Sequence, residues 1–74
     1  MNTVEYYLED VLSELIDESS KIKTENGSDF NQGRLMAYYE VLSLALDQAR
    51  AFDIFDQLPQ RVRDFRPESL LNPD

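Results

Sequence analysis

Carboxylates spaced four residues apart are the side chains of this chain that most resemble a reactive or metal-binding site. The spacing occurs near the N-terminus in the pairs Glu5/Glu9, Asp10/Glu14 and Glu14/Glu18. On a helix such pairs share a face, but helical di-metal proteins hold their ions with inward-facing Glu and a Glu-x-x-His motif. The chain contains no His, and these acids fall on the polar side of their segment. We therefore expect no functional metal site.

Nucleophilic chemistry would need a serine with a base beside it, because the chain has neither His nor Cys. Ser19 and Ser20 lie next to Lys21 and Lys23, near the expected end of a helix, where the sequence predicts no pocket. We therefore predict that the protein is not an enzyme. No catalytic residue and no cofactor are expected.

The charge of the chain restricts its partners. The net charge is −8, from 15 acids and 7 bases. Such acidity disfavours direct binding to nucleic acid, which requires a basic surface, and binding to anionic membranes. No apolar run approaches the roughly 20 residues of a membrane span, and no signal-peptide pattern is present. The sequence predicts a soluble, cytoplasmic protein without direct nucleic-acid or membrane contacts.

A first amphipathic helix is predicted over residues 4–23, with Asn2 as its N-cap and acids along its outer face. Its apolar residues recur with the i, i+3, i+4, i+7 spacing of a helix. They are Val4, Tyr7, Leu8, Val11, Leu12, Leu15, Ile16 and Ile22. The polar residues around Asn26 and Gly27 predict a short turn into a second, antiparallel helix.

The second helix is predicted over residues 30–52, with Asp29 as its N-cap and Gln32 as the capping-box partner. Between residues 35 and 46 its apolar side chains point in nearly all directions. A helix of this kind must be covered on more than one side, and the chain offers one other long amphipathic segment. A second copy of the chain is therefore the expected cover.

The fold expected from these helices is all-α: an antiparallel two-helix hairpin that pairs with a second copy into a four-helix bundle. The second helices would form the homodimer interface. Its expected residues are Leu35, Tyr38, Tyr39, Val41, Leu42, Ala45, Leu46 and Ala49.

A short helical appendage is predicted after the hairpin, with Asp56 as N-cap, Pro59 in its first turn and Pro67 as its stop. Val62 and Phe65 are expected to pack back on the hairpin. The chain then divides into a helical domain over residues 1–66 and an extended tail over residues 67–74. Leu70 and Leu71 are the residues that would hold this tail in place.

Residues 33–43 read Gly-Arg-Leu-Met-Ala-Tyr-Tyr-Glu-Val-Leu-Ser. This stretch resembles small bacterial proteins with a Gly-Arg-x-x-x-Tyr-Tyr-Glu-Val-Leu-Ser-like helix preceded by an acidic helix. The resemblance implies a helical hairpin and no assigned activity. Asp53 stands where the resemblance leads us to expect Gly, so the end of the second helix is expected to differ.

Two functions are compatible with these features. The first is a non-enzymatic association or regulatory module that homodimerises through its second helix. The alternative is an acidic inhibitor of the mobile-element type, which would imitate nucleic acid and bind a basic protein through the first helix. The partner surface would then comprise Tyr6, Glu9, Asp10, Glu14 and Asp17.

Overall fold

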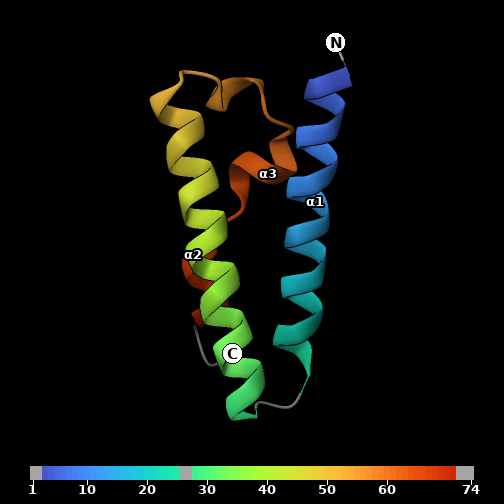
Figure 1. Cartoon of the computed structure of the whole chain (residues 1–74), viewed down its shortest axis with the longest axis vertical. Helices are drawn as coiled ribbons and strands as arrows, with labels where there is room; N and C mark the ends of the chain where they lie inside the picture. The colour runs from blue at the N-terminus through green and yellow to red at the C-terminus, as the bar shows by residue number, and fades with distance from the viewer. Residues whose placement is uncertain (1–2, 26–27, 72–74) are drawn as a thin grey trace.

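Two long antiparallel helices form the frame of the structure (Figure 1). The computed structural model describes residues 3–25 and 28–71, and helices account for 87% of these residues. Helix α1 spans Thr3–Thr24 and helix α2 spans Asp29–Ala51. The predicted all-α hairpin is therefore confirmed. The predicted cap at Asn2, the turn at Asn26 and Gly27, and the last residues of the expected tail, 72–74, lie outside the described residues.

Helix α2 begins one residue earlier than predicted because Ser28, not Asp29, is its N-cap. The backbone of Ser28 is extended (φ −105°, ψ 163°), and its hydroxyl accepts a hydrogen bond from the Asn31 amide at 3.1 Å. Asp29 is the first helical residue, where its carboxylate still faces the positive end of the helix dipole. Two neighbouring residues were suitable caps, and the one with extended backbone takes that position.

Helix α2 ends in a Schellman motif that contains no glycine. The amide of Ile54 donates to the Ala49 carbonyl at 2.9 Å, and that of Asp53 donates to the Arg50 carbonyl at 3.0 Å. Asp53 adopts a φ of 61°, the left-handed conformation that Gly usually supplies at this position. This conformation costs a typical L-residue about 1–2 kcal/mol, although Asp tolerates it better than most. We call residues 52–54 the elbow.

After the elbow the chain turns back along the hairpin as a C-terminal arm, residues 55–71. The arm consists of the 3₁₀ helix η1 (Phe55–Gln57), the short helix α3 (Gln60–Asp64) and the 3₁₀ helix η2 (Pro67–Leu71). Helix α3 contacts α1, and η2 contacts both long helices. In Figure 1 the arm passes behind the hairpin.

The arm corrects two predictions. The expected appendage capped by Asp56 is split: η1 contains Asp56, and α3 begins after Pro59 without a side-chain cap. The expected extended tail is a 3₁₀ helix over Pro67–Leu71, because burial of Pro67 and Leu70 against the hairpin holds this segment in place. The expected packing of Val62 and Phe65 is confirmed: Val62 is buried, and Phe65 packs half-buried against the core.

The hydrophobic core lies between the two long helices and the arm. Four of its seven buried members come from the hairpin and three come from the arm. They are Ile16, Leu42, Leu46, Ala49, Leu58, Val62 and Leu70. Ser19 is fully buried as well, and its hydroxyl donates to the Ile16 carbonyl at 2.9 Å. This side chain is small, so it fills little space in the interior.

Candidate functional site

One face of the hairpin carries large apolar side chains that no other described segment covers. From α1 it includes Val4, Tyr7 and Leu8, and from α2 it includes Val41, Leu44 and Phe52. Because the helices are antiparallel, the first half of α1 lies beside the second half of α2. These six side chains therefore gather toward one end of the molecule. We call this surface the open face.

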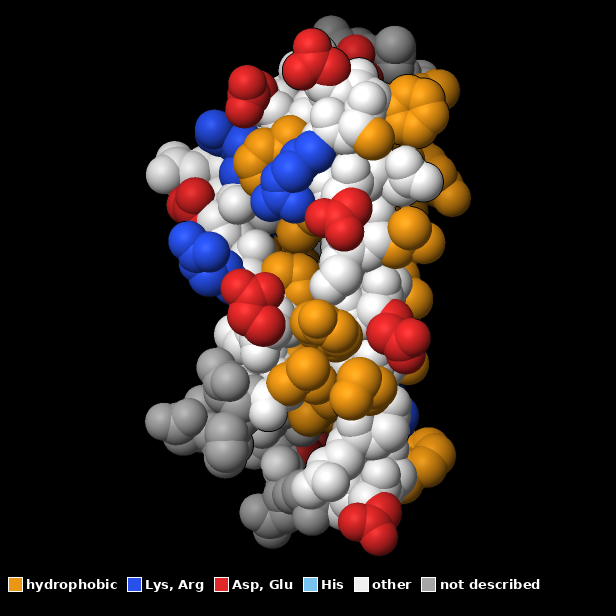
Figure 2. Space-filling model, turned by 90° about the vertical axis from the view of Figure 1, so that its left-hand side faces the viewer, with side chains coloured by type: hydrophobic (Ala, Val, Ile, Leu, Met, Phe, Trp, Pro, Cys, Tyr) orange, Lys and Arg blue, Asp and Glu red, His pale blue; other side chains and the backbone are white. Residues whose placement is uncertain are grey.

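The positions of the arm contacts show that the open face lies opposite the arm. On α1 the side chains that bond to the arm are Asp17 and Lys23, and Val4 is rotated by about 100° or more from both on the helix. On α2 the residues that line the depression beside the arm include Ser43 and Leu46, and Val41 points to another side. Figure 2 shows hydrophobic side chains along the right-hand edge of the molecule and a second group in the lower centre of the same view.

The exposure of these residues is high for their type. Tyr7 is 65% exposed, Leu44 61% and Phe52 74%. Single exposed apolar residues are ordinary on protein surfaces, but a contiguous group marks an interaction site. Interface cores are enriched in aromatic side chains, and this set of six residues includes Tyr7 and Phe52.

The structure divides the predicted dimer interface into three groups. Leu42, Leu46 and Ala49 are buried inside the single chain, under α1 and the arm. Leu35, Tyr38, Tyr39 and Ala45 are half-buried. Of the predicted residues, Val41 is the one that is exposed. The cover that we expected from a second chain at the three buried positions is supplied by the chain's own C-terminal arm.

The residues that sequence reasoning left out of the interface are Val4, Tyr7, Leu8, Leu44 and Phe52. Helical periodicity placed the α1 members on the same apolar side as the core residues, and it could not show that this side is wider than the area α2 covers. For Leu44 a signal was present: it follows Val41 by three residues on the second apolar face of α2.

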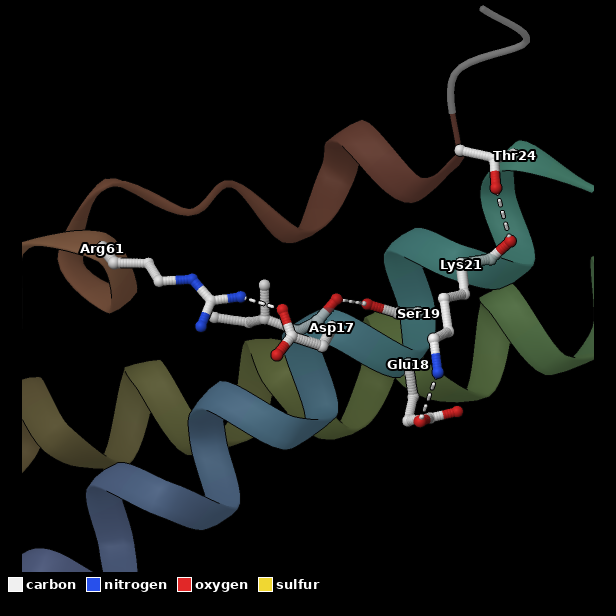
Figure 3. Close-up of polar contacts among 7 residues, drawn as sticks. Asp17, Glu18, Ser19, Lys21, Thr24 and Arg61 are labelled. Carbon is white, nitrogen blue, oxygen red and sulfur yellow. Dashed lines mark hydrogen bonds and ion pairs between the residues drawn. The ribbon is translucent and has the colours of Figure 1, made fainter.

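The acidic face of α1 is partly neutralised within the chain (Figure 3). Arg61 from α3 forms an ion pair and hydrogen bond with the Asp17 carboxylate. Lys21 pairs with Glu18 at 3.4 Å, one turn along the same helix. Both pairs are substantially exposed, so each contributes at most about 1 kcal/mol to stability.

The remaining residues of the predicted acidic surface lie in the first part of α1, where Asp10 is three residues from Tyr7 of the open face. Tyr6, Asp10 and Glu14 are exposed on the outer side of α1, and Glu9 is half-buried. Within the described residues, no group of three or more acids could hold a metal ion. No helix in the described part of the chain has the length and hydrophobicity needed to cross a membrane.

A depression of about 580 Å³ lies between α2 and the arm. The Arg50 guanidinium carbon lies 4.4 Å from the centre of the Phe55 ring. The same guanidinium forms an ion pair with the Asp47 carboxylate at 3.3 Å. Arg63 and Arg66 also line it, but so do Asp64 and Glu68. Its charges balance, so the depression offers no net attraction to an anion or a cation. Figure 2 shows acidic and basic side chains interspersed on this side.

No protein-family model matches the chain, and no curated protein or solved structure matches it. The resemblance to small bacterial hairpin proteins therefore stays a prediction.

Proposed function

We propose that the protein is a non-enzymatic association module and that two copies pair through the open face. The observation that carries this proposal is the group of exposed apolar side chains on α1 and α2, opposite the arm. A chain of 74 residues builds a small core, and pairing two such faces would extend that core across four long helices. The second copy is the occupant that we propose because the face is apolar, and two copies of one surface can meet across a two-fold axis.

The acidic-inhibitor function has less support. A mimic of nucleic acid needs unpaired charges spread over its surface, whereas Asp17 and Glu18 already have basic partners within the chain.

Replacement of a single open-face leucine tests the pairing. Leu44→Asp places a charge at a 61%-exposed position, so the monomer fold should be retained while the paired face would have to bury an unpaired carboxylate. Sedimentation should show a dimer for the wild type at micromolar concentration and a monomer for Leu44→Asp, with equal helix content by circular dichroism.

Leu71→Asp is the matched control, because Leu71 is an exposed leucine in η2 of the arm and not on the open face. This variant should remain dimeric. A wild-type protein that stays monomeric at high concentration would overturn the proposal. Equal loss of pairing in Leu71→Asp would show that the open face is not the interface.

A further inference from the structure

The elbow between α2 and the arm is a turn that the local sequence does not require. From Arg34 to Leu58 the chain contains neither Gly nor Pro, so no residue in this stretch forces a helix to stop. The turn nevertheless occurs at Asp53, the one non-glycine residue with positive φ in the described part of the chain. The docking of the arm, with Ile54 and Phe55 packed against the core, is the tertiary contact that can hold this turn.

If the elbow became a continuous helix, its two backbone hydrogen bonds would change partners, but neither bond would be lost. In the turn the Asp53 amide bonds to the Arg50 carbonyl, and the Ile54 amide bonds to the Ala49 carbonyl. In a continuous helix the same two amides would bond to the same two carbonyls in the opposite pairing, Asp53 to Ala49 and Ile54 to Arg50. The helix would run on through η1 until Pro59, which disfavours helical backbone at Leu58. The elbow therefore has two arrangements with equal hydrogen bonding.

The structure of the arm depends on its contacts with the hairpin. Its elements are three to five residues long, too short to be stable alone. It is anchored by apolar residues that sit in the groove between α1 and α2, with Val62 only 1% exposed and Leu70 3% exposed. Two polar contacts to α1 fix its position: Arg61 to Asp17, and the Lys23 ammonium to the Ser69 carbonyl.

We propose that the elbow is a hinge and that the groove beneath the arm accepts the arm of a second copy of this chain. With the elbow straight, Leu42 and Leu46 of one copy lose their cover, and the arm of the other copy is the segment that fits them. All apolar anchors and both polar contacts would re-form between copies in a reciprocal exchange. This contact lies opposite the open face, so it is independent of the pairing proposed above.

Variants of Asp53 test the hinge. Each is made together with Leu44→Asp, which removes pairing through the open face. Asp53→Gly accepts the left-handed turn without strain and should stay monomeric. Asp53→Ala disfavours that turn and favours helix. Its dimer dissociation constant should be at least about tenfold lower than that of the Asp53→Gly protein.

A charge exchange at the arm shows whether the dimer is formed by arms in trans. Asp17 and Arg61 are both about half exposed, so either charge can be reversed without disrupting the core. In the Asp53→Ala, Leu44→Asp background, one chain carries Asp17→Lys and the other carries Arg61→Glu. Neither chain can form the ion pair with itself or with its own copy. In a mixed dimer both ion pairs are restored across chains, with one of them reversed.

Sedimentation of the equimolar mixture should show heterodimers at concentrations where each chain alone is monomeric. A mixture that behaves as the sum of its two components would overturn the proposal, as would equal self-association of the Asp53→Ala and Asp53→Gly proteins. These failures would leave the open-face pairing untouched. Conversely, a wild type that does not pair through Leu44 would leave the arm exchange standing.

Discussion

At the scale of single residues, the two ends of α2 are fixed by side chains that do not follow the commonest sequence signals. Ser28 caps the start although Asp29 follows it, and Asp53 takes a conformation usually given to Gly. Sequence reasoning placed both ends within one residue but chose Asp29 as the cap, and this choice is wrong. The cap is the residue with extended backbone, which the local sequence does not determine.

Replacement of the observed cap should lower stability. Ser28→Ala removes the hydroxyl that accepts from the Asn31 amide, and loss of such a cap typically costs about 1 kcal/mol. Urea denaturation of the wild type and the variant would give this difference in the free energy of unfolding. Ser20→Ala, at an exposed position inside α1, is the control and should be neutral or slightly stabilising. A neutral Ser28→Ala would mean that Asp29 takes over as the cap.

At the scale of elements, the periodicity of apolar residues predicted the two long helices but not the arm. Each long helix has more than twenty residues, so the helical spacing of its apolar residues is repeated over several turns. The elements of the arm are at most five residues long, and their order comes from contacts with residues far away in the sequence. Lys23 and Ser69, for example, are 46 positions apart. No local pattern contains that information.

The same limit explains the error about the cover of α2. Leu42, Leu46 and Ala49 were correctly recognised as residues that must be buried. The covering residues Leu58, Val62 and Leu70 are spread over a segment broken by two prolines. Val62 and Leu70 were expected to pack on the hairpin, but no periodic pattern showed that this segment covers Leu42, Leu46 and Ala49. A second chain was therefore expected where the first chain is sufficient.

The arm should contribute to stability as a full layer of the fold. Leu70→Ala removes a side chain that is 3% exposed, and large-to-small changes in a core cost about 2–5 kcal/mol. Leu71→Ala is the matched control, since the neighbouring side chain is 43% exposed and should cost less than about 1 kcal/mol. Thermal and urea denaturation would measure both differences. Equal effects would contradict the placement of η2 against α2.

At the scale of the whole molecule, the net charge of −8 opposes any pairing of two copies. Pairing through the open face buries apolar side chains, whereas the acids remain at the surface and repel one another. Added salt screens this repulsion: the screening length falls from about 30 Å at 0.01 M to about 3 Å at 1 M. The dimer should therefore become tighter as salt is raised.

Sedimentation across this salt range measures the dimer dissociation constant directly. The Leu44→Asp, Asp53→Gly protein should remain monomeric at every salt concentration and provides the control. A dimer that weakens with salt would indicate a contact between opposite charges, and the open face would not be its origin.

The position of the arm at the C-terminal side of the hairpin affects how the chain folds during translation. During translation α1 and α2 leave the ribosome before the segment that covers them, and chains begin to fold from the N-terminal side. For that interval Leu42 and Leu46 face water on a nascent hairpin whose core lacks Leu58, Val62 and Leu70. The interior is completed only when the last of these has emerged. If translation paused after α2, the exposed Leu42 and Leu46 would form an apolar surface that a chaperone could bind.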